Sequence, residues 1–154
     1  MVEISLRGKV VVITGGGSGI GRGAALAFAD AGATIAILER SPEGATETID
    51  LLRAKGVEAE YFEVDVSRPD QLKTAIDAAA ERFGGIDVVY ANAGINGVWA
   101  PIEEITEEEY DRTMDINLKG TFFTIQAAVP HLKSRGGGSI LVTASVNGTR
   151  MFSN

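Results

Sequence analysis

The sequence contains no cysteine and only one histidine, His131, among its 154 residues. Without cysteine the chain can form no disulfide bond, no thiolate zinc site and no cysteine nucleophile. With one histidine, a multi-histidine metal site is excluded, and a Ser-His catalytic pair would have to use His131 itself. We therefore expect no metal site in this chain.

The sequence also lacks any run of lysine or arginine and any long apolar stretch. Its 14 basic residues are outnumbered by 21 acidic ones, and the net charge of −7 argues against a nucleic-acid-binding surface. No apolar segment reaches the ~18 residues that a membrane span requires. The first residues do not read as a signal peptide, because Glu3 precedes any basic residue and no long apolar core follows. We expect a soluble cytoplasmic protein that binds neither nucleic acid nor membrane.

Apolar segments alternate with segments of helical pattern along the chain, and 154 residues is a length typical of one domain. We treat residues 1–154 as a single domain. Strands are predicted at residues 9–14, 34–38, 57–64, 86–91 and 139–143, and helices at 20–31, 42–55, 69–83 and 106–135. Continuous apolar strands joined by helices predict a parallel sheet covered on both faces. The expected fold is therefore α/β, a doubly wound parallel sheet of Rossmann type with about five strands.

The last predicted helix has three features of its own. Thr106 and Glu109 have the spacing of a capping box at its start. A break is expected near Asn117. Pro130 should kink the helix or loosen one turn.

Glycines gather between the first predicted strand and the first predicted helix, in the segment Gly15-Gly16-Gly17-Ser18-Gly19-Ile20-Gly21. A pyrophosphate bound at a helix N-terminus must approach backbone N–H groups closely, and a Cβ atom would block it. The glycines alone are equally compatible with a plain tight turn. The apolar strand before them and the helix after them are the context that a dinucleotide-binding loop requires.

An acidic residue, Glu39, ends the second predicted strand. Dinucleotide-binding proteins carry a carboxylate for the ribose ~20 residues after the glycines, and the position of Glu39 is close to that spacing. Glu39 favours NAD over NADP, since a carboxylate repels a 2′-phosphate. Arg40 follows directly and would offset part of that repulsion, so NADP stays the alternative cofactor. The two residues could also be a solvated ion pair at a strand end.

These residues form part of an ordered set of motifs that resembles the short-chain dehydrogenase/reductase family over residues 6–148. Thr14 to Gly21 looks like the family's TGxxxGIG cofactor loop, and residues 91–94, Ala-Asn-Ala-Gly, are similar to its NNAG motif with alanine first. Asp65 and Val66 stand where the family contacts the adenine. The resemblance implies that the cofactor is held by Gly15, Ser18, Gly19, Ile20, Gly21, Glu39, Arg40, Asp65, Val66, Asn92, Ala93 and Gly94.

The resemblance also implies a reaction, hydride transfer between NAD(P) and an alcohol or ketone. Asn117 falls on the family's active-site asparagine, which fixes a water in a proton relay, and Ser145 falls on its catalytic serine, which polarises the substrate oxygen. In the family a tyrosine is the general acid/base, and a lysine four residues later lowers its pKa. Family members are commonly dimers or tetramers built on the long helix, so a homo-oligomer is expected.

The chain departs from the family in one respect, because none of its tyrosines, Tyr61, Tyr90 and Tyr110, has a lysine four residues later. In the family the Tyr-x-x-x-Lys pair comes shortly after the serine, which would place it just beyond Asn154. We therefore expect a parent protein that is a short-chain dehydrogenase/reductase, a chain truncated before this motif, and no activity of this chain alone.

Two other functions stay open. A non-catalytic NAD(P)-binding module would bind the cofactor without turnover and would leave a sheet edge at the fifth strand that needs a partner to cover it. An unrelated Rossmann-type enzyme, such as a methyltransferase, is disfavoured by residues 92–94 together with Ser145. The particular substrate is not set by these residues.

Overall fold

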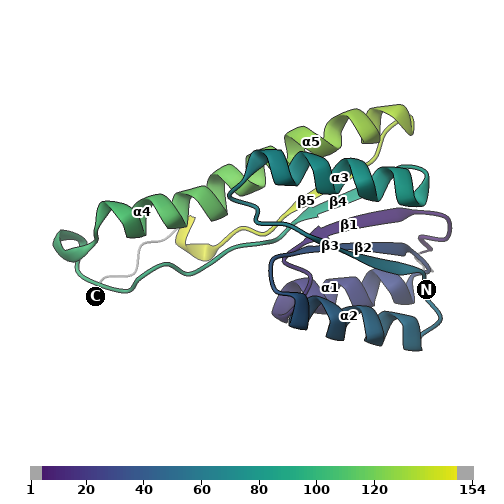
Figure 1. Ribbon diagram of the computed structural model, residues 1–154, viewed down its shortest axis with the longest axis horizontal. Helices are drawn as coiled ribbons and strands as arrows, with labels where there is room; N and C mark the ends of the chain where they lie inside the picture. Colours follow the sequence, from purple (N-terminus) through teal and green to yellow (C-terminus); the bar gives the residue numbers. More distant parts are fainter. Residues whose placement is uncertain (1–4, 149–154) are drawn as a thin grey trace.

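The computed structural model describes residues 5–148, which form one sheet of five strands with helices on both sides (Figure 1). The strands are β1 (Val10–Thr14), β2 (Thr34–Glu39), β3 (Ala59–Glu63), β4 (Val88–Ala91) and β5 (Ser139–Val142). Their order across the sheet is β3-β2-β1-β4-β5, and every neighbouring pair is parallel. The chain winds outward from β1 to one edge, returns past β1 and winds outward to the other edge.

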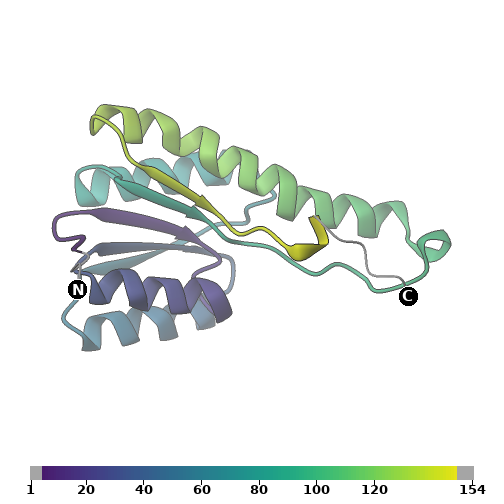
Figure 2. The same ribbon diagram turned by 180° about the vertical axis from the view of Figure 1, so that it is seen from behind.

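Helices cover both faces of this sheet (Figure 2). They are α1 (Gly19–Asp30), α2 (Pro42–Ala54), α3 (Pro69–Phe83), α4 (Glu107–Met114) and α5 (Gly120–Ser134), with a π-helical turn at Asp115–Lys119 and short 3₁₀ helices at Ile102–Glu104 and Val146–Gly148. Helices α1 and α2 pack on one face, and α3 and α5 pack on the other. The predicted doubly wound Rossmann-type α/β fold is confirmed.

The central strands are apolar at successive positions because both of their faces are buried. Val11 and Ile13 of β1 belong to the core beneath α1 and α2, whereas Val12 belongs to the core beneath α3 and α5. All three side chains are fully buried, and burial of each contributes about 1.5–3 kcal/mol. The continuous apolar run therefore marks a strand covered on both sides.

The long helical region after β4 bears out two of its three predicted features. The capping box is present, since the Thr106 side chain accepts from the Glu109 N–H and the Glu109 carboxylate accepts from the Thr106 N–H. The break near Asn117 is a π-helical turn between α4 and α5. Pro130 lies inside α5, which runs from Gly120 to Ser134, and the kink or loosened turn expected there stays a prediction.

Two predicted strands are longer than the observed ones, while the other bounds agree within one residue. The strand predicted at 57–64 is β3, Ala59–Glu63, because the Val57 N–H donates to the Leu52 carbonyl and so closes α2. The strand predicted at 86–91 begins at Val88. Apolar pattern does not distinguish a residue that leads into a strand from one that belongs to it.

Strand β5 forms one edge of the sheet, and its side chains are exposed. Ile140, Leu141 and Val142 keep 41%, 39% and 48% of their surface accessible. A parallel edge strand of this composition presents unpaired backbone groups and apolar side chains together. Within residues 5–148, no helix combines the length and the apolar character needed to cross a membrane.

Asp87 fastens the amino end of the sheet. Its carboxylate, 6% exposed, accepts from the Val10 backbone N–H at 3.0 Å, from Lys9 Nζ at 3.0 Å and from Arg135 Nη2 at 3.1 Å. Burial raises the pKa of Asp87, but these hydrogen bonds outweigh burial and hold the pKa below its usual value.

Replacing Asp87 by alanine should lower the free energy of unfolding by about 1–3 kcal/mol, because the buried Val10 N–H loses its acceptor. The folded-state pKa is depressed, so the stabilisation is complete above the unfolded aspartate pKa of about 3.9 and is lost as pH falls through the folded value. Denaturant unfolding of the protein that carries this chain, repeated from neutral to acidic pH, measures both effects.

The difference between wild type and Asp87→Ala should shrink with acidification. Lys9→Met is the control, since Lys9 is 52% exposed and its loss should cost about 1 kcal/mol or less. An Asp87→Ala variant as stable as wild type at neutral pH would contradict the stabilising role of Asp87.

Candidate cofactor site

A cleft of about 660 Å³ opens at the carboxyl ends of the strands, where the winding direction changes between β1 and β4. Ligands of doubly wound sheets bind at this position. The cleft brings together every residue that the sequence analysis predicts for cofactor binding or catalysis: Gly15, Ser18, Gly19, Ile20, Gly21, Glu39, Arg40, Asp65, Val66, Asn92, Ala93, Gly94, Asn117 and Ser145. Further lining residues, which no motif marks, are Leu38, Val64, Ile95, Asn96, Ile116, Thr121, Thr143 and Ala144.

Two glycines let the loop between β1 and α1 lie directly against neighbouring backbone. Gly15 has a φ of +68°, and a Cβ atom there would sit 2.9 Å from the Cα of Ala93. A Cβ atom at Gly21 would overlap the Gly15 carbonyl oxygen and lie 2.7 Å from Asn92 Nδ2. These two glycines are therefore required by the packing of the loop itself.

Helix α1 presents an uncapped N-terminus at the cleft. Ser18 is the N-cap residue, but its side chain makes no capping hydrogen bond, and the first turn carries no acidic residue. Apart from its own helix and chain neighbours, a Cβ atom at Gly19 would meet no atom of residues 5–148 within 4 Å, so this position faces open space among them. Backbone N–H groups at a helix N-terminus attract anions. The arrangement can receive a phosphate group.

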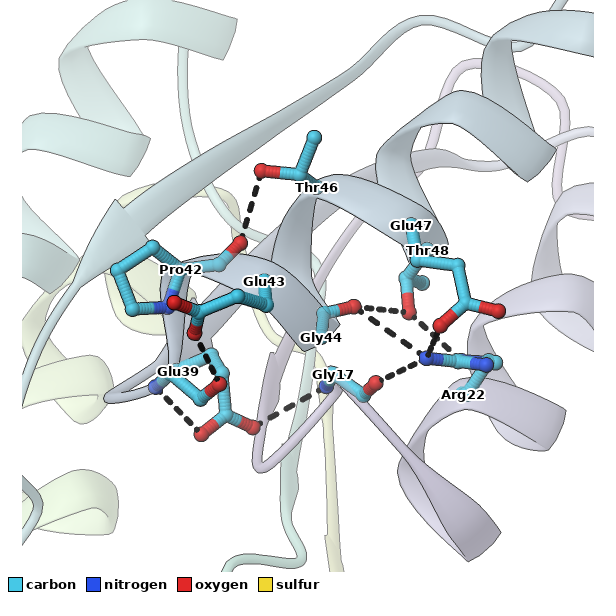
Figure 3. Close-up of polar contacts among 10 residues, drawn as sticks. Gly17, Arg22, Glu39, Pro42, Glu43, Gly44, Thr46, Glu47 and Thr48 are labelled. Carbon is cyan, nitrogen blue, oxygen red and sulfur yellow. Dashed lines mark hydrogen bonds and ion pairs between the residues drawn. The ribbon is translucent and has the colours of Figure 1, made fainter.

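Glu39 ends β2 and accepts three backbone hydrogen bonds, of which Figure 3 shows the one from Gly17. Its Oε2 accepts from the Gly17 N–H at 3.2 Å, and its Oε1 accepts from the N–H groups of Arg40 at 2.8 Å and Ser41 at 3.1 Å. A carboxylate offers about four lone-pair positions, so Glu39 can accept from a ligand hydroxyl as well.

Asp65 and Val66 lie after β3 on the opposite wall of the cleft from the glycine loop's helix. Asp65 Oδ1 accepts from the Ser67 N–H at 3.0 Å and from the Ser67 hydroxyl at 2.8 Å. Burial raises the pKa of Asp65, but the Ser67 hydrogen bonds, with Arg40 and Arg68 nearby, outweigh burial and hold the pKa below its usual value. Asp65 is therefore an acceptor at neutral pH, beside the buried Val66.

Thr14 and Asn92 tie the residues after β4 to the glycine loop. Thr14 Oγ1 accepts from the N–H groups of Asn92 at 3.0 Å and Ala93 at 3.1 Å. Asn92 Nδ2 donates to the carbonyls of Thr14 at 3.2 Å and Gly15 at 3.3 Å. The Thr143 hydroxyl donates to Asn92 Oδ1 at 2.8 Å and so adds the end of β5. The sequence carries no signal for Thr143, since its partner is far away along the chain.

Asn117 stands in the π-helical turn, and its side chain holds the loop after β4. Its Oδ1 accepts from the Ile95 N–H at 2.8 Å, and its Nδ2 donates to the Ile95 carbonyl at 2.8 Å. The Thr121 hydroxyl donates to the Asn117 carbonyl at 2.8 Å. Asn117 thus joins the long helix to the cleft, which Ser145 lines from the segment after β5.

The winding of the sheet, the glycine loop that leads into an uncapped helix and the acid at the end of β2 together define a Rossmann-type nucleotide-binding fold. Within that class, the family model for short chain dehydrogenase matches residues 9–154. The chain belongs to the short-chain dehydrogenase/reductase family, whose members are oxidoreductases.

An uncharacterized oxidoreductase of Thermotoga maritima is 41% identical over 145 residues, which cover 94% of this chain and 57% of that relative. The crystal structure of a 3-ketoacyl-ACP reductase from Sinorhizobium meliloti 1021 is 48% identical with a TM-score of 0.90, covering 93% of this chain and 56% of that one. Carveol dehydrogenase from Mycobacterium avium, in complex with NAD, is 34% identical with a TM-score of 0.93, covering 97% and 58%. The chain spans little more than half the length of these relatives.

Replacing Asn117 by alanine should release the loop after β4, because the N–H and carbonyl of Ile95 both lose their partner. We expect amide hydrogen exchange in residues 95–101 to rise by about tenfold or more. Asn117→Asp retains the acceptor and loses the donor, so it should give an intermediate rate. Hydrogen exchange measured on the protein that carries this chain checks both variants. Unchanged rates in Asn117→Ala would show that Asn117 does not hold the loop after β4.

Proposed function

We propose that the protein containing this chain is an oxidoreductase that transfers a hydride between NAD and an alcohol or ketone. The observation that carries the proposal is a single cleft lined by the glycine loop, by Glu39, by residues 92–94, by Asn117 and by Ser145. Family membership supports it. Bound NAD would supply or accept the hydride, which is chemistry that side chains do not offer.

The residues of the cleft fit a dinucleotide. The backbone N–H groups of residues 18–20, at the uncapped start of α1, would hold the pyrophosphate, and the open space at Gly19 supports this placement. Gly15 and Gly21 would shape the loop beneath it. Glu39 would accept hydrogen bonds from the adenosine ribose.

The opposite wall would hold the adenine and the rest of the cofactor. Asp65 would accept from the adenine amino group, with the apolar Val66 against the base. Residues 92–94 would line the cofactor on the β4 side, where Asn92 is already held by Thr14.

We propose NAD as the cofactor, with NADP as the alternative. Glu39 is placed to accept from a ribose hydroxyl and would repel a 2′-phosphate. Arg40 also lines the cleft and would offset part of that repulsion. The NAD complex of carveol dehydrogenase, a structural neighbour, supports the first choice.

For catalysis we propose that Ser145 polarises the substrate oxygen and that Asn117 holds part of a proton relay. The general acid/base would be a tyrosine, with a lysine four residues later, in sequence beyond Asn154. The match to only 56–58% of the related chains supports a longer polypeptide. Residues 1–154 would be its NAD(P)-binding domain, inactive alone.

The second candidate is a non-catalytic NAD(P)-binding module. One observation favours it: the edge strand β5 is exposed. Such a module would bind NADH without turnover and would meet a partner at β5.

A homo-oligomer, dimer or tetramer, and a cytoplasmic location stay predictions. Tyr110, Leu118 and Phe122 support the oligomer, because they lie along the α4–α5 region and are 57%, 61% and 58% exposed. An apolar stripe of this kind fits a helix-to-helix contact between two copies.

Gly19→Ala should weaken NADH binding by about tenfold or more, since its Cβ would occupy the approach to the helix N-terminus. Gly8→Ala is a matched control. Both glycines have positive φ, +49° and +72°, both face open space, and only Gly19 lines the cleft. Each variant should lose about 1 kcal/mol of stability from backbone strain. The measurement is titration of NADH followed by fluorescence. An equal loss of affinity in both variants would refute the placement of the pyrophosphate at Gly19.

Ser145→Ala should lower turnover by about 100-fold or more, because the substrate oxygen loses a donor, while NADH affinity changes by less than about twofold. The assay is NAD-dependent oxidation of a panel of secondary alcohols by the native protein, whose intact mass is determined first. A mass well above that of 154 residues is expected. A mass equal to it, with NADH binding and no turnover, would favour the binding module instead.

A further inference from the structure

Arg22 makes an unusual set of contacts near the start of α1 (Figure 3). Its Nη2 donates to the Gly17 carbonyl at 2.6 Å and to Glu47 Oε2 at 2.8 Å, and it lies 3.5 Å from the Gly44 carbonyl. Its Nε donates to Thr48 Oγ1 at 3.0 Å. One side chain, 23% exposed, thereby joins α1, the glycine loop and α2.

Gly17 is enclosed by the Glu39 side chain and by the backbone of α2. It is buried, its N–H donates to Glu39 Oε2 and its carbonyl accepts from Arg22. A Cβ atom at Gly17 would lie 2.9 Å from Glu39 Cγ, and one at Gly44 would lie 2.9 Å from the Gly17 oxygen. Glu39 therefore holds the peptide group that precedes the Gly17 Cα, and Arg22 holds the Gly17–Ser18 peptide group that follows it.

Of the contacts that Arg22 makes, the hydrogen bond to the Gly17 carbonyl is the one that favours this side chain most. A cation near a helix N-terminus opposes the helix dipole and so is unfavourable by itself. The ion pair with Glu47 offsets little, because Glu47 is 64% exposed. A buried carbonyl, in contrast, requires a donor, and a charged donor makes the stronger bond.

We infer that Arg22 is a positioning residue for the cofactor, an inference that rests on the proposed function. By holding the Gly17 carbonyl, Arg22 fixes the planar Gly17–Ser18 peptide group and with it the direction of the Ser18 N–H, at the start of α1 where the pyrophosphate would bind. Glu39 holds the preceding peptide group through the Gly17 N–H, so the two side chains together restrain the Gly17 backbone. Arg22 thereby acts on NAD affinity, and on the choice between NAD and NADP, without lining the cleft itself.

The test is titration of NADH and of NADPH into the native protein and its variants, with thermal unfolding of each variant in the absence of cofactor. Arg22→Met should weaken NADH binding by about tenfold, the equivalent of one charge-assisted hydrogen bond, and should reduce the ratio of NADH to NADPH affinity. Glu47→Gln is the matched control, because it removes the exposed partner of Arg22 and leaves the Gly17 bond. Its NADH affinity should stay within about twofold of wild type.

Arg22→Lys tests the positioning role of Arg22 if Arg22→Met does not fold. Lysine keeps the charge and the stem but loses the planar fork that reaches Gly17 and Thr48 together, so NADH binding should be about threefold weaker. Wild-type NADH affinity in the folded Arg22 variants, whatever their melting temperature, would overturn the inference and leave the proposed function intact. Wild-type protein that binds neither NADH nor NADPH would overturn both.

Discussion

The close approach of two backbone segments, the glycine loop and the residues after β4, is the constraint on which the candidate site depends. Gly15 lies against Ala93, and Gly21 lies against the Gly15 carbonyl, with no room for a side chain at either glycine. Helix α1 can start at the cleft only because the loop lies this close to β4. A larger residue would move the helix N-terminus away from the switch point of the sheet, and with it the backbone N–H groups that attract an anion.

Hydrogen bonds turn this contact into a fixed geometry. Thr14, Asn92 and Thr143 join the carboxyl ends of β1, β4 and β5, while Asp87 joins the amino end of β1 through Val10 and the end of α5 through Arg135. Each such bond contributes only about 0.5–1.5 kcal/mol net, so the network matters more for position than for stability. Asn117 extends it to the long helix, which gives up regular α-helical bonding for one π-helical turn at that residue.

The sequence predicts the fold and the membership of the cleft because both follow from local pattern. Apolar strands such as β1 are buried on both faces, and the motif residues other than Asn117 lie at or shortly after the carboxyl ends of parallel strands, which meet at one edge. What it does not predict depends on long-range partners. Thr143 is marked by no motif, and its contact with Asn92 exists only once β4 and β5 are paired.

Glu39 shows why loop structure and cofactor choice are coupled in this fold. Its carboxylate accepts three backbone N–H groups and is also the group proposed to bind the ribose. Arg40 and Ser41 are exposed, so their N–H groups can turn to water if the carboxylate is removed. Gly17 is buried and cannot. A substitution at position 39 therefore changes the shape of the glycine loop together with the recognition of the ribose. Arg22 restrains the carbonyl of the same residue, Gly17, from outside the cleft, so its contribution can be separated from direct contact with the cofactor.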